Sequence, residues 1–279
     1  PLQGEMRSLL RLPTYRYAAV RHFVTTTFEG QGVAVLRLDR PPVNSLNLEM
    51  SLAIVDAVKE IESLGEARSL VLCSSSKTIF SAGLDIKEMH QPDPEKLAQF
   101  WSSIQQIFLS LYGSRLWTVS SLQGHAPAGG CLLAMSTDYR VMENNLNFKI
   151  GLSETKLGIA APYWLAQLMA STIGQRRAEL ATQDGTLFSP FEALEIGLVD
   201  EVADSREAVE ARCLELAARY ARIPHVARNK SKQALRRPFL DDLRSYRQRD
   251  IEDFCSFILT DEVQRGLTAY LSSLGSKKM

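Results

Sequence analysis

Short β-like runs alternate with helix-like segments over most of the chain, and this order restricts the fold more than any other feature. Strand-like runs occupy five segments: 32–39, 69–76, 116–124, 138–143 and 197–202. The clearest helical segments, 47–65 and 94–112, lie between the first three of them. Strands that alternate with helices predict an α/β fold with parallel strands.

The pattern divides the chain into three parts. Residues 29–207 are expected to form the α/β core. From about Ala208 only helical patterns remain, so residues 208–279 are expected to form a helical subdomain packed on that core, because no Pro-rich or Gly/Ser-rich linker separates them. Residues 1–28 are expected to lie outside both parts.

The amino-terminal part has the composition of a targeting signal. Residues 1–5 precede Met6 and resemble a remnant of recombinant expression, whereas residues 6–28 contain four arginines and no acid. This composition resembles a mitochondrial transit peptide. A basic, disordered terminus is the alternative.

Composition and charge exclude several classes of function. The chain has 279 residues with 32 basic and 32 acidic groups, so no excess charge favours nucleic acid as a partner. Its four cysteines form no C-x-x-C pair, which argues against a metal site and against a disulfide framework. No apolar run approaches the ~20 residues of a membrane span.

Two glycine turns carry the chemical signal. The stretch GHAPAGGCLLAM (124–135) follows a strand and enters an apolar helix, and FSAGLD (80–85) has the same form. Neither matches a phosphate loop, a dinucleotide fingerprint or a serine nucleophile elbow. The free N–H groups at such turns can hold a developing oxyanion. The alternative for either turn alone is an ordinary strand-to-helix connection.

Three motifs in order make the pattern specific. FSAGLDIKEM, APAGGCLLAMSTDYRV and GLSETKLGIAAPYW resemble the crotonase, or enoyl-CoA hydratase/isomerase, superfamily, as does the earlier RPPVNSLN. The resemblance implies a ClpP-like spiral of ββα units with C-terminal helices that cover the site. It also implies acyl-CoA substrates and a homotrimer or a dimer of trimers.

The resemblance assigns the reacting groups. The backbone N–H groups of Leu84 and Gly129 would form an oxyanion hole for the thioester oxygen, and a Cβ at position 129 would crowd that thioester. Hydratases of the family carry one glutamate directly after G-G-C and a second in G-x-x-E. Here Leu132 occupies the first position and only Glu154 is present. One carboxylate can move a proton between two carbons but is poorly equipped to position water.

Further residues are candidates for contacts with the substrate. The resemblance implies that the CoA portion is flanked by Val43, Ala82, Asp85, Ile86 and Lys87, and Lys87 would either lie near a phosphate or be a solvated helix residue. Leu132, Pro162 and Trp164 would line the acyl pocket. The basic residues 228, 230, 232, 236 and 237 would either approach phosphates or form a solvated helix face.

The sequence therefore predicts an isomerase that converts 3-enoyl-CoA to trans-2-enoyl-CoA in the β-oxidation of unsaturated fatty acids, similar to the mitochondrial Δ3,Δ2-enoyl-CoA isomerases and located in the mitochondrial matrix. It predicts no metal, no nucleic acid partner and no cofactor, since CoA is part of the substrate. Hydration or thioester hydrolysis, with Asp85, Glu88 or Asp138 as the acid, stays open. A non-catalytic relative that binds RNA or a protein is the third alternative.

Overall fold

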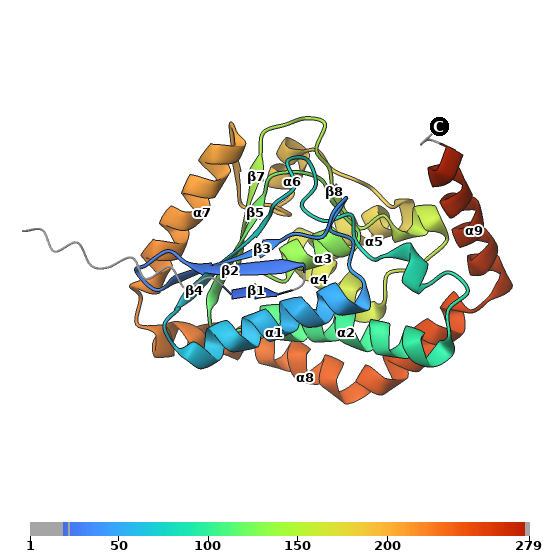
Figure 1. Cartoon of the computed structure of the whole chain (residues 1–279), viewed down its shortest axis with the longest axis horizontal. Coiled ribbons are helices and arrows are strands. Elements are labelled where there is room, and N and C mark those ends of the chain that lie inside the picture. The colour runs from blue at the N-terminus through green and yellow to red at the C-terminus, as the bar shows by residue number, and fades with distance from the viewer. Residues whose placement is uncertain (1–18, 22, 277–279) are drawn as a thin grey trace, which may run out of the picture.

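A seven-stranded sheet lies at the centre of the computed structural model, which describes residues 19–21 and 23–276 (Figure 1). In spatial order its strands are β1 (Ala19–Arg21), β2 (Val24–Phe28), β3 (Val33–Leu38), β4 (Ser69–Ser74), β5 (Trp117–Leu122), β7 (Tyr139–Glu143) and β9 (Glu201–Ala203). From β3 to β9 all neighbours run parallel, whereas β1, β2 and β3 are antiparallel. The parallel strands confirm the predicted α/β class.

The start of the core was placed too late by the sequence. β2 pairs with β3 along its whole length, and Val24 and Phe28 are buried. Residues 24–28 (VTTTF) are all β-branched or aromatic, and buried positions alternate with partly exposed ones, which is the pattern of a strand with one buried face. The sheet therefore includes residues that were assigned to the targeting segment. Residues 1–18, which hold most of that segment, lie outside the described part of the chain.

A second, shorter layer gives the chain its spiral course. β6 (Ala126–Pro127) pairs in parallel with β8 (Ile150–Gly151), and single bridges join Leu46 to Leu84 and Ile79 to His125. Each repeat thus adds a strand to the large sheet, then a short extended piece to this layer, then a helix or helical turn. This arrangement is the ββα spiral that the resemblance implied.

The helices of the core follow the sequence pattern closely. They are α1 (Leu48–Leu64), α2 (Pro94–Tyr112), α3 (Gly129–Met135), α4 (Tyr163–Ile173), α5 (Gln175–Asp184) and α6 (Pro190–Glu195), with the 3-10 turns η1 (Ile86–Glu88) and η2 (Glu154–Leu157). The Asn47 side chain caps α1 by accepting the Met50 N–H, and Gly65 ends it at a φ of 70°. Both boundaries confirm the prediction.

The last predicted strand is shorter than expected. Only Glu201 and Val202 of the predicted run 197–202 belong to β9. Leu198 and Val199 are buried in the turn after α6, where both N–H groups donate to the Ala193 carbonyl. Their apolar character reflects burial in the core rather than strand pairing.

The three C-terminal helices have different positions. α7 (Arg206–Ala221) packs on one face of the sheet, where its Val209 and Cys213 meet Val35 and Val71. The other face, including Leu36 and Leu72, belongs to the main core. α7 is thus a layer of the core rather than part of a separate cover. α8 (His225–Ile258) runs along α2, which separates it from α1, and α9 (Asp261–Ser276) lies at the far end (Figure 1).

Candidate active site

The first glycine turn is held by the preceding layer of the spiral. The Ala82 N–H donates to the Val43 carbonyl over 3.0 Å, the Leu46 N–H to Gly83 over 2.8 Å, and the Asp85 N–H to Leu46 over 2.9 Å. Gly83 has a φ of 91°, which L side chains rarely adopt. These bonds fix the peptide between Gly83 and Leu84.

Asn44 stabilises this turn through hydrogen bonds. The sequence alone did not identify this role. Its buried amide donates to Ser74 Oγ over 2.8 Å and to the Phe80 carbonyl over 3.1 Å. Ser81 Oγ in turn donates to the Asn44 carbonyl over 2.7 Å and accepts the Gly83 N–H. The RPPVNSLN motif contained a signal for this role, because Asn44 is a polar residue with a short side chain that stands between two apolar stretches.

The second glycine turn packs directly against the first. A Cβ added to Gly130 would lie 2.3 Å from the Ser81 carbonyl oxygen, and one added to Gly129 would lie 3.0 Å from Gly83 Cα and 3.1 Å from Leu84 N. The protein backbone therefore excludes a side chain at Gly130 and crowds one at Gly129. The glycine geometry does not test the predicted clash between a Cβ at position 129 and the thioester, which stays a prediction.

The two turns bring two free donors to one place. The space that a Cβ of Gly129 would occupy is bordered by Leu84 N, and Gly129 N lies 2.8 Å from the equivalent point above Gly83. Neither N–H donates a hydrogen bond to a residue in the described part of the chain. Two unsatisfied backbone donors in one place are what an oxyanion hole requires.

Glu154 is tied to the same structure through the short sheet. β6 leads into Gly129, its partner β8 leads through Leu152 and Ser153 to Glu154, and the Ala128 N–H donates to the Gly151 carbonyl over 2.8 Å. The pairing of β6 with β8 thus sets the distance between the second donor and the carboxylate. Glu154 opens the turn η2, whose end at Gly158 is left-handed.

The Glu154 carboxylate is shielded and largely unpaired. Its Oε2 is buried and has no hydrogen-bond partner among the described residues. Burial raises the pKa of Glu154 to about 7, and a hydrogen bond from its own backbone N–H only partly opposes this effect. A carboxyl group with a pKa near the ambient pH can both take up and release a proton.

The residues after the glycine pair add no second acid. Cys131 is fully buried, and its thiol pKa is raised by burial and further by the nearby charge of Glu154. Leu132 is 1% exposed and belongs to the main core. The two positions after the glycine pair therefore supply no charge to the site.

The other acids that the sequence left open are already engaged. Asp85 Oδ2 pairs with the Arg40 guanidinium at 2.8 Å, and Asp85 Oδ1 caps η1. Glu88 accepts the Leu48 N–H over 3.2 Å. Asp138 pairs with Lys232 and Arg236, each at 2.8 Å. Each of these carboxylates has a structural partner, unlike Glu154.

The residues assigned to CoA lie together on the first turn. Val43 and Ala82 are hydrogen-bonded to each other through the backbone, and Ile86 and Lys87 form η1 directly after Asp85. Lys87 is exposed and forms no ion pair with another described residue, so it is available to a phosphate. Asp85 is committed to Arg40, which limits its role to shaping the turn.

The residues assigned to the acyl pocket separate into two groups. Pro162 lines a cavity of about 460 Å³ between the loop after η2 and the C-terminal half of α8, together with Ala161, Asp250 and Phe254. Trp164 is fully buried behind that wall, and its indole N–H donates to Asp250 Oδ2 over 3.2 Å. Leu132 does not line this cavity.

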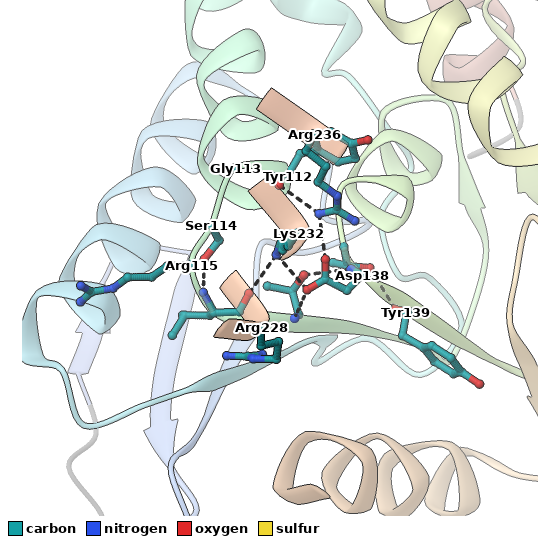
Figure 2. Close-up of polar contacts among 12 residues, drawn as sticks. Tyr112, Gly113, Ser114, Arg115, Asp138, Tyr139, Arg228, Lys232 and Arg236 are labelled. Atoms are coloured by element: carbon teal, nitrogen blue, oxygen red, sulfur yellow. Dashed lines mark hydrogen bonds and ion pairs between the residues drawn. The ribbon is translucent and has the colours of Figure 1, made fainter. Parts of the chain in front are cut away.

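The basic residues of α8 are neither a uniform solvated face nor a set of free phosphate ligands (Figure 2). Lys232 and Arg236 reach Asp138, and Lys232 Nζ also donates to the Leu116 carbonyl over 2.9 Å. Burial lowers the pKa of Lys232 to about 8, although the Asp138 charge opposes this shift. These contacts fasten α8 to the sheet.

No group of three or more His, Cys, Asp or Glu residues in the described chain is arranged to hold a metal ion. Among the same residues, no helix is both long enough and apolar enough to cross a membrane.

Comparison with known proteins defines the class. Residues 29–276 match the enoyl-CoA hydratase/isomerase family, so the chain belongs to this family. The curated relatives include enoyl-CoA delta isomerase 1, mitochondrial, of Rattus norvegicus, which is 43% identical over 90% of this chain and 86% of its own length. The protein of the same name from Homo sapiens is 42% identical over 89% of this chain and 82% of its own.

Solved structures agree with this assignment. The crystal structure of human mitochondrial delta3-delta2-enoyl-CoA isomerase superposes with a TM-score of 0.90 at 41% identity, covering 92% of this chain and all of the other. An enoyl-CoA hydratase from Bacillus halodurans has a TM-score of 0.81 at 20% identity, over 88% of this chain and 99% of its own. The second match shows the shared crotonase fold alone.

Proposed function

We propose that the protein is a Δ3,Δ2-enoyl-CoA isomerase that transposes a carbon–carbon double bond with Glu154 as its only acid–base group. The observation that carries this proposal is the buried, unpartnered Oε2 of Glu154, which the pairing of β6 with β8 connects to two neighbouring free N–H groups, with Leu132 where a second acid would stand. The relatives named enoyl-CoA delta isomerase support the same reaction.

The proposed reaction has two proton transfers and one intermediate. Ionised Glu154 removes a proton from C2 of a 3-enoyl-CoA, and the thioester oxygen gains negative charge between the N–H groups of Leu84 and Gly129. The protonated Glu154 then delivers the proton to C4, which yields trans-2-enoyl-CoA. Each oxyanion donor is worth about 3 kcal/mol in reactions of this type.

The substrate positions extend from this centre. The CoA portion would be flanked by Val43, Ala82, Ile86 and Lys87. Lys87, which is exposed and forms no ion pair with another described residue, would meet a phosphate. The cavity beside Pro162 would take the acyl tail, with Trp164 behind its wall. CoA enters as part of the substrate, and the proposal requires no separate cofactor.

A substrate comparison tests the function. The purified protein should convert 3-hexenoyl-CoA to 2-hexenoyl-CoA, followed by the absorbance of the conjugated thioester. It should release little 3-hydroxybutyryl-CoA from crotonyl-CoA, because no second carboxylate positions water. Efficient hydration of crotonyl-CoA, or free CoA as the main product, would instead assign one of the other reactions of the family.

Two glycine substitutions, one in the site and one outside it, test the oxyanion hole. Gly129→Ala places a methyl group against Gly83 and Leu84 N, so kcat should fall about 100-fold. Gly65→Ala is the matched control, since that position has a φ of 70° but nothing within 4 Å of the added Cβ. It should cost about 1 kcal/mol of stability and leave kcat unchanged. Equal losses of kcat in both variants would remove the assignment.

The relatives' names also bear on location. They are mitochondrial proteins, and we propose the mitochondrial matrix for this chain, with the basic residues before Ala19 as its signal. We also propose a homotrimer, alone or paired as a dimer of trimers, as the resemblance implies. Light scattering of the purified protein distinguishes these assemblies from a monomer.

A further inference from the structure

We propose that a cluster of arginines at the amino ends of β4 and β5 binds a phosphate-type anion, at a site separate from the catalytic centre. We call this cluster the arginine pocket and define it by Arg68, Arg115, His225 and Arg228. The first three line a cavity of about 210 Å³ together with Gly65, Ala67 and Leu116. Arg228 adjoins it by donating to the Arg68 carbonyl over 2.7 Å.

The arginine pocket carries positive charge that nearby acids do not balance. Within the described chain, none of its three guanidinium groups forms an ion pair. The Arg115 guanidinium donates to the carbonyl of Glu62, whose carboxylate accepts Ser114 Oγ and the Arg115 backbone N–H. Glu66 is exposed and does not line the cavity. This local excess contrasts with a chain whose formal net charge is zero.

Asp138, an acid whose charge acts on Arg228, already has other cationic partners. It pairs with Lys232 and Arg236 at 2.8 Å each and also accepts the Thr118 N–H over 2.8 Å. In Figure 2, Arg228 lies on the side of Asp138 opposite Arg236, and Arg115 lies apart from this network. Positive charge therefore accumulates between α8 and the sheet without a carboxylate left to neutralise it.

Arg228 has an unused donor in this region. The residue is half-buried, and its Nε is buried without a hydrogen-bond partner among the described residues. Burial lowers the pKa of Arg228, Asp138 opposes the shift and Arg68 adds to it. A buried donor without a partner is destabilising, so an anion that accepted a hydrogen bond from it would be favoured.

The geometry of His225 fits the same ligand. Arg68 Nη1 lies 2.9 Å from His225 Nδ1, and because a guanidinium only donates, Nδ1 is the acceptor of this hydrogen bond. His225 is also the first residue of α8, where no side chain caps the free N–H groups. A cavity of about 210 Å³ is smaller than a typical pocket for a drug-sized ligand, which favours a compact oxyanion.

The arginine pocket and the catalytic centre lie at opposite ends of the strands. Arg68 precedes the first residue of β4 and Leu116 precedes that of β5, whereas both glycine turns follow the other ends of these strands. A six-residue strand separates its ends by about 17 Å. Occupancy of the pocket can therefore change the stability of the protein without contact with the substrate.

Equilibrium dialysis with radiolabelled inorganic phosphate tests the proposal on the full chain at constant ionic strength. We expect one saturable phosphate per chain, with affinity at least 10-fold weaker in both Arg68→Gln and Arg228→Gln. The control Arg176→Gln removes an exposed arginine of α5 and should bind as the unaltered protein does. A parallel arm with AMP shows whether the pocket accepts a phosphate monoester as well as the free ion.

Melting temperatures provide a second readout, because a ligand that binds the folded state raises them by mass action. Phosphate should raise the melting temperature of the unaltered protein and of Arg176→Gln, but not that of Arg68→Gln, whose exposed side chain is dispensable for folding. Absence of saturable binding to the unaltered protein would overturn the proposal. So would an affinity for phosphate in Arg68→Gln and Arg228→Gln that equals the affinity of the unaltered protein.

Discussion

The carboxylates of Asp250, a buried residue, and of Glu154, whose Oε2 is buried, have opposite surroundings. Asp250 Oδ2 accepts hydrogen bonds from Gln105 Nε2 at 2.7 Å, Trp101 Nε1 at 2.8 Å and Trp164 Nε1 at 3.2 Å. Glu154 Oε2 accepts none from the described residues. The first carboxylate is satisfied and joins α8 to α2 and α4, whereas the second keeps its capacity for a proton. Saturation by donors thus separates the structural carboxylate from the reactive one.

The largest effect is expected from Glu154→Gln. The amide keeps the size of the side chain but cannot shuttle a proton, so kcat for 3-hexenoyl-CoA should fall about 10³-fold or more. Acyl-CoA binding, measured by calorimetry, should stay within a few-fold. If the variant kept more than a tenth of the activity, the reactive carboxylate would lie elsewhere. The contrast with Asp250 would then not separate a reactive carboxylate from a structural one.

Asp250→Ala should have the reverse profile. Its removal leaves two indole N–H groups and one amide without their acceptor in the core, which should cost about 3 kcal/mol of unfolding free energy. The kcat of the folded protein for a short substrate should change by no more than a few-fold. Urea unfolding measures the first quantity, and Asp250→Asn, which keeps one acceptor oxygen, is the milder control.

The pH dependence of stability should follow Glu154. The folded state raises its pKa from 4.5 to about 7, so the folded protein binds the proton more tightly than the unfolded chain. The resulting stability is fully present below pH 4.5 and is lost as the pH rises through 7. Glu154→Gln lacks this proton, so its stability relative to the unaltered protein should increase by about 3 kcal/mol between pH 4 and pH 8.

Urea midpoints of both proteins at several pH values measure this difference. A constant difference across the range would mean that the carboxylate is as well solvated in the folded protein as in the unfolded chain. The kcat/KM for isomerisation should rise through the same pH region, because the base acts in its ionised form.

The smallest effect is expected from Trp164→Phe. The change removes the longest of the three hydrogen bonds to Asp250 and keeps the other two, so the unfolding free energy should fall by about 1–2 kcal/mol. Thermal unfolding measures it. A loss as large as that of Asp250→Ala would show that Trp164, rather than the carboxylate, holds this part of the core together.

Local patterns predicted the fold well where one residue type determines the backbone. Asn47 and Gly65 bound α1 as expected, and the two glycine turns were recognised from their small residues. Residues 24–28 were assigned to the wrong part, because serines, threonines and arginines around them gave the composition of a targeting signal. Their pairing with β3 is a long-range contact that composition does not encode.

The candidate site was predictable only through its motifs. Glu154, Leu84 and Gly129 were placed by resemblance, and the structure brings their segments together. Asn44 and Asp250 were missed, since each acts through partners far away in the sequence: Asn44 with Ser74 and Phe80, Asp250 with residues of two other helices. The partners of Lys232 were hidden for the same reason.

The transfer of an isotopic label tests the central claim most directly. If one shielded carboxylate removes the proton from C2 and returns it to C4, a 3-enoyl-CoA deuterated at C2 should give a product that carries part of the deuterium at C4 after a single turnover in ordinary water. Mass spectrometry and NMR of the product measure this fraction. Complete loss of the label to solvent, with none at C4, would contradict a single-glutamate shuttle.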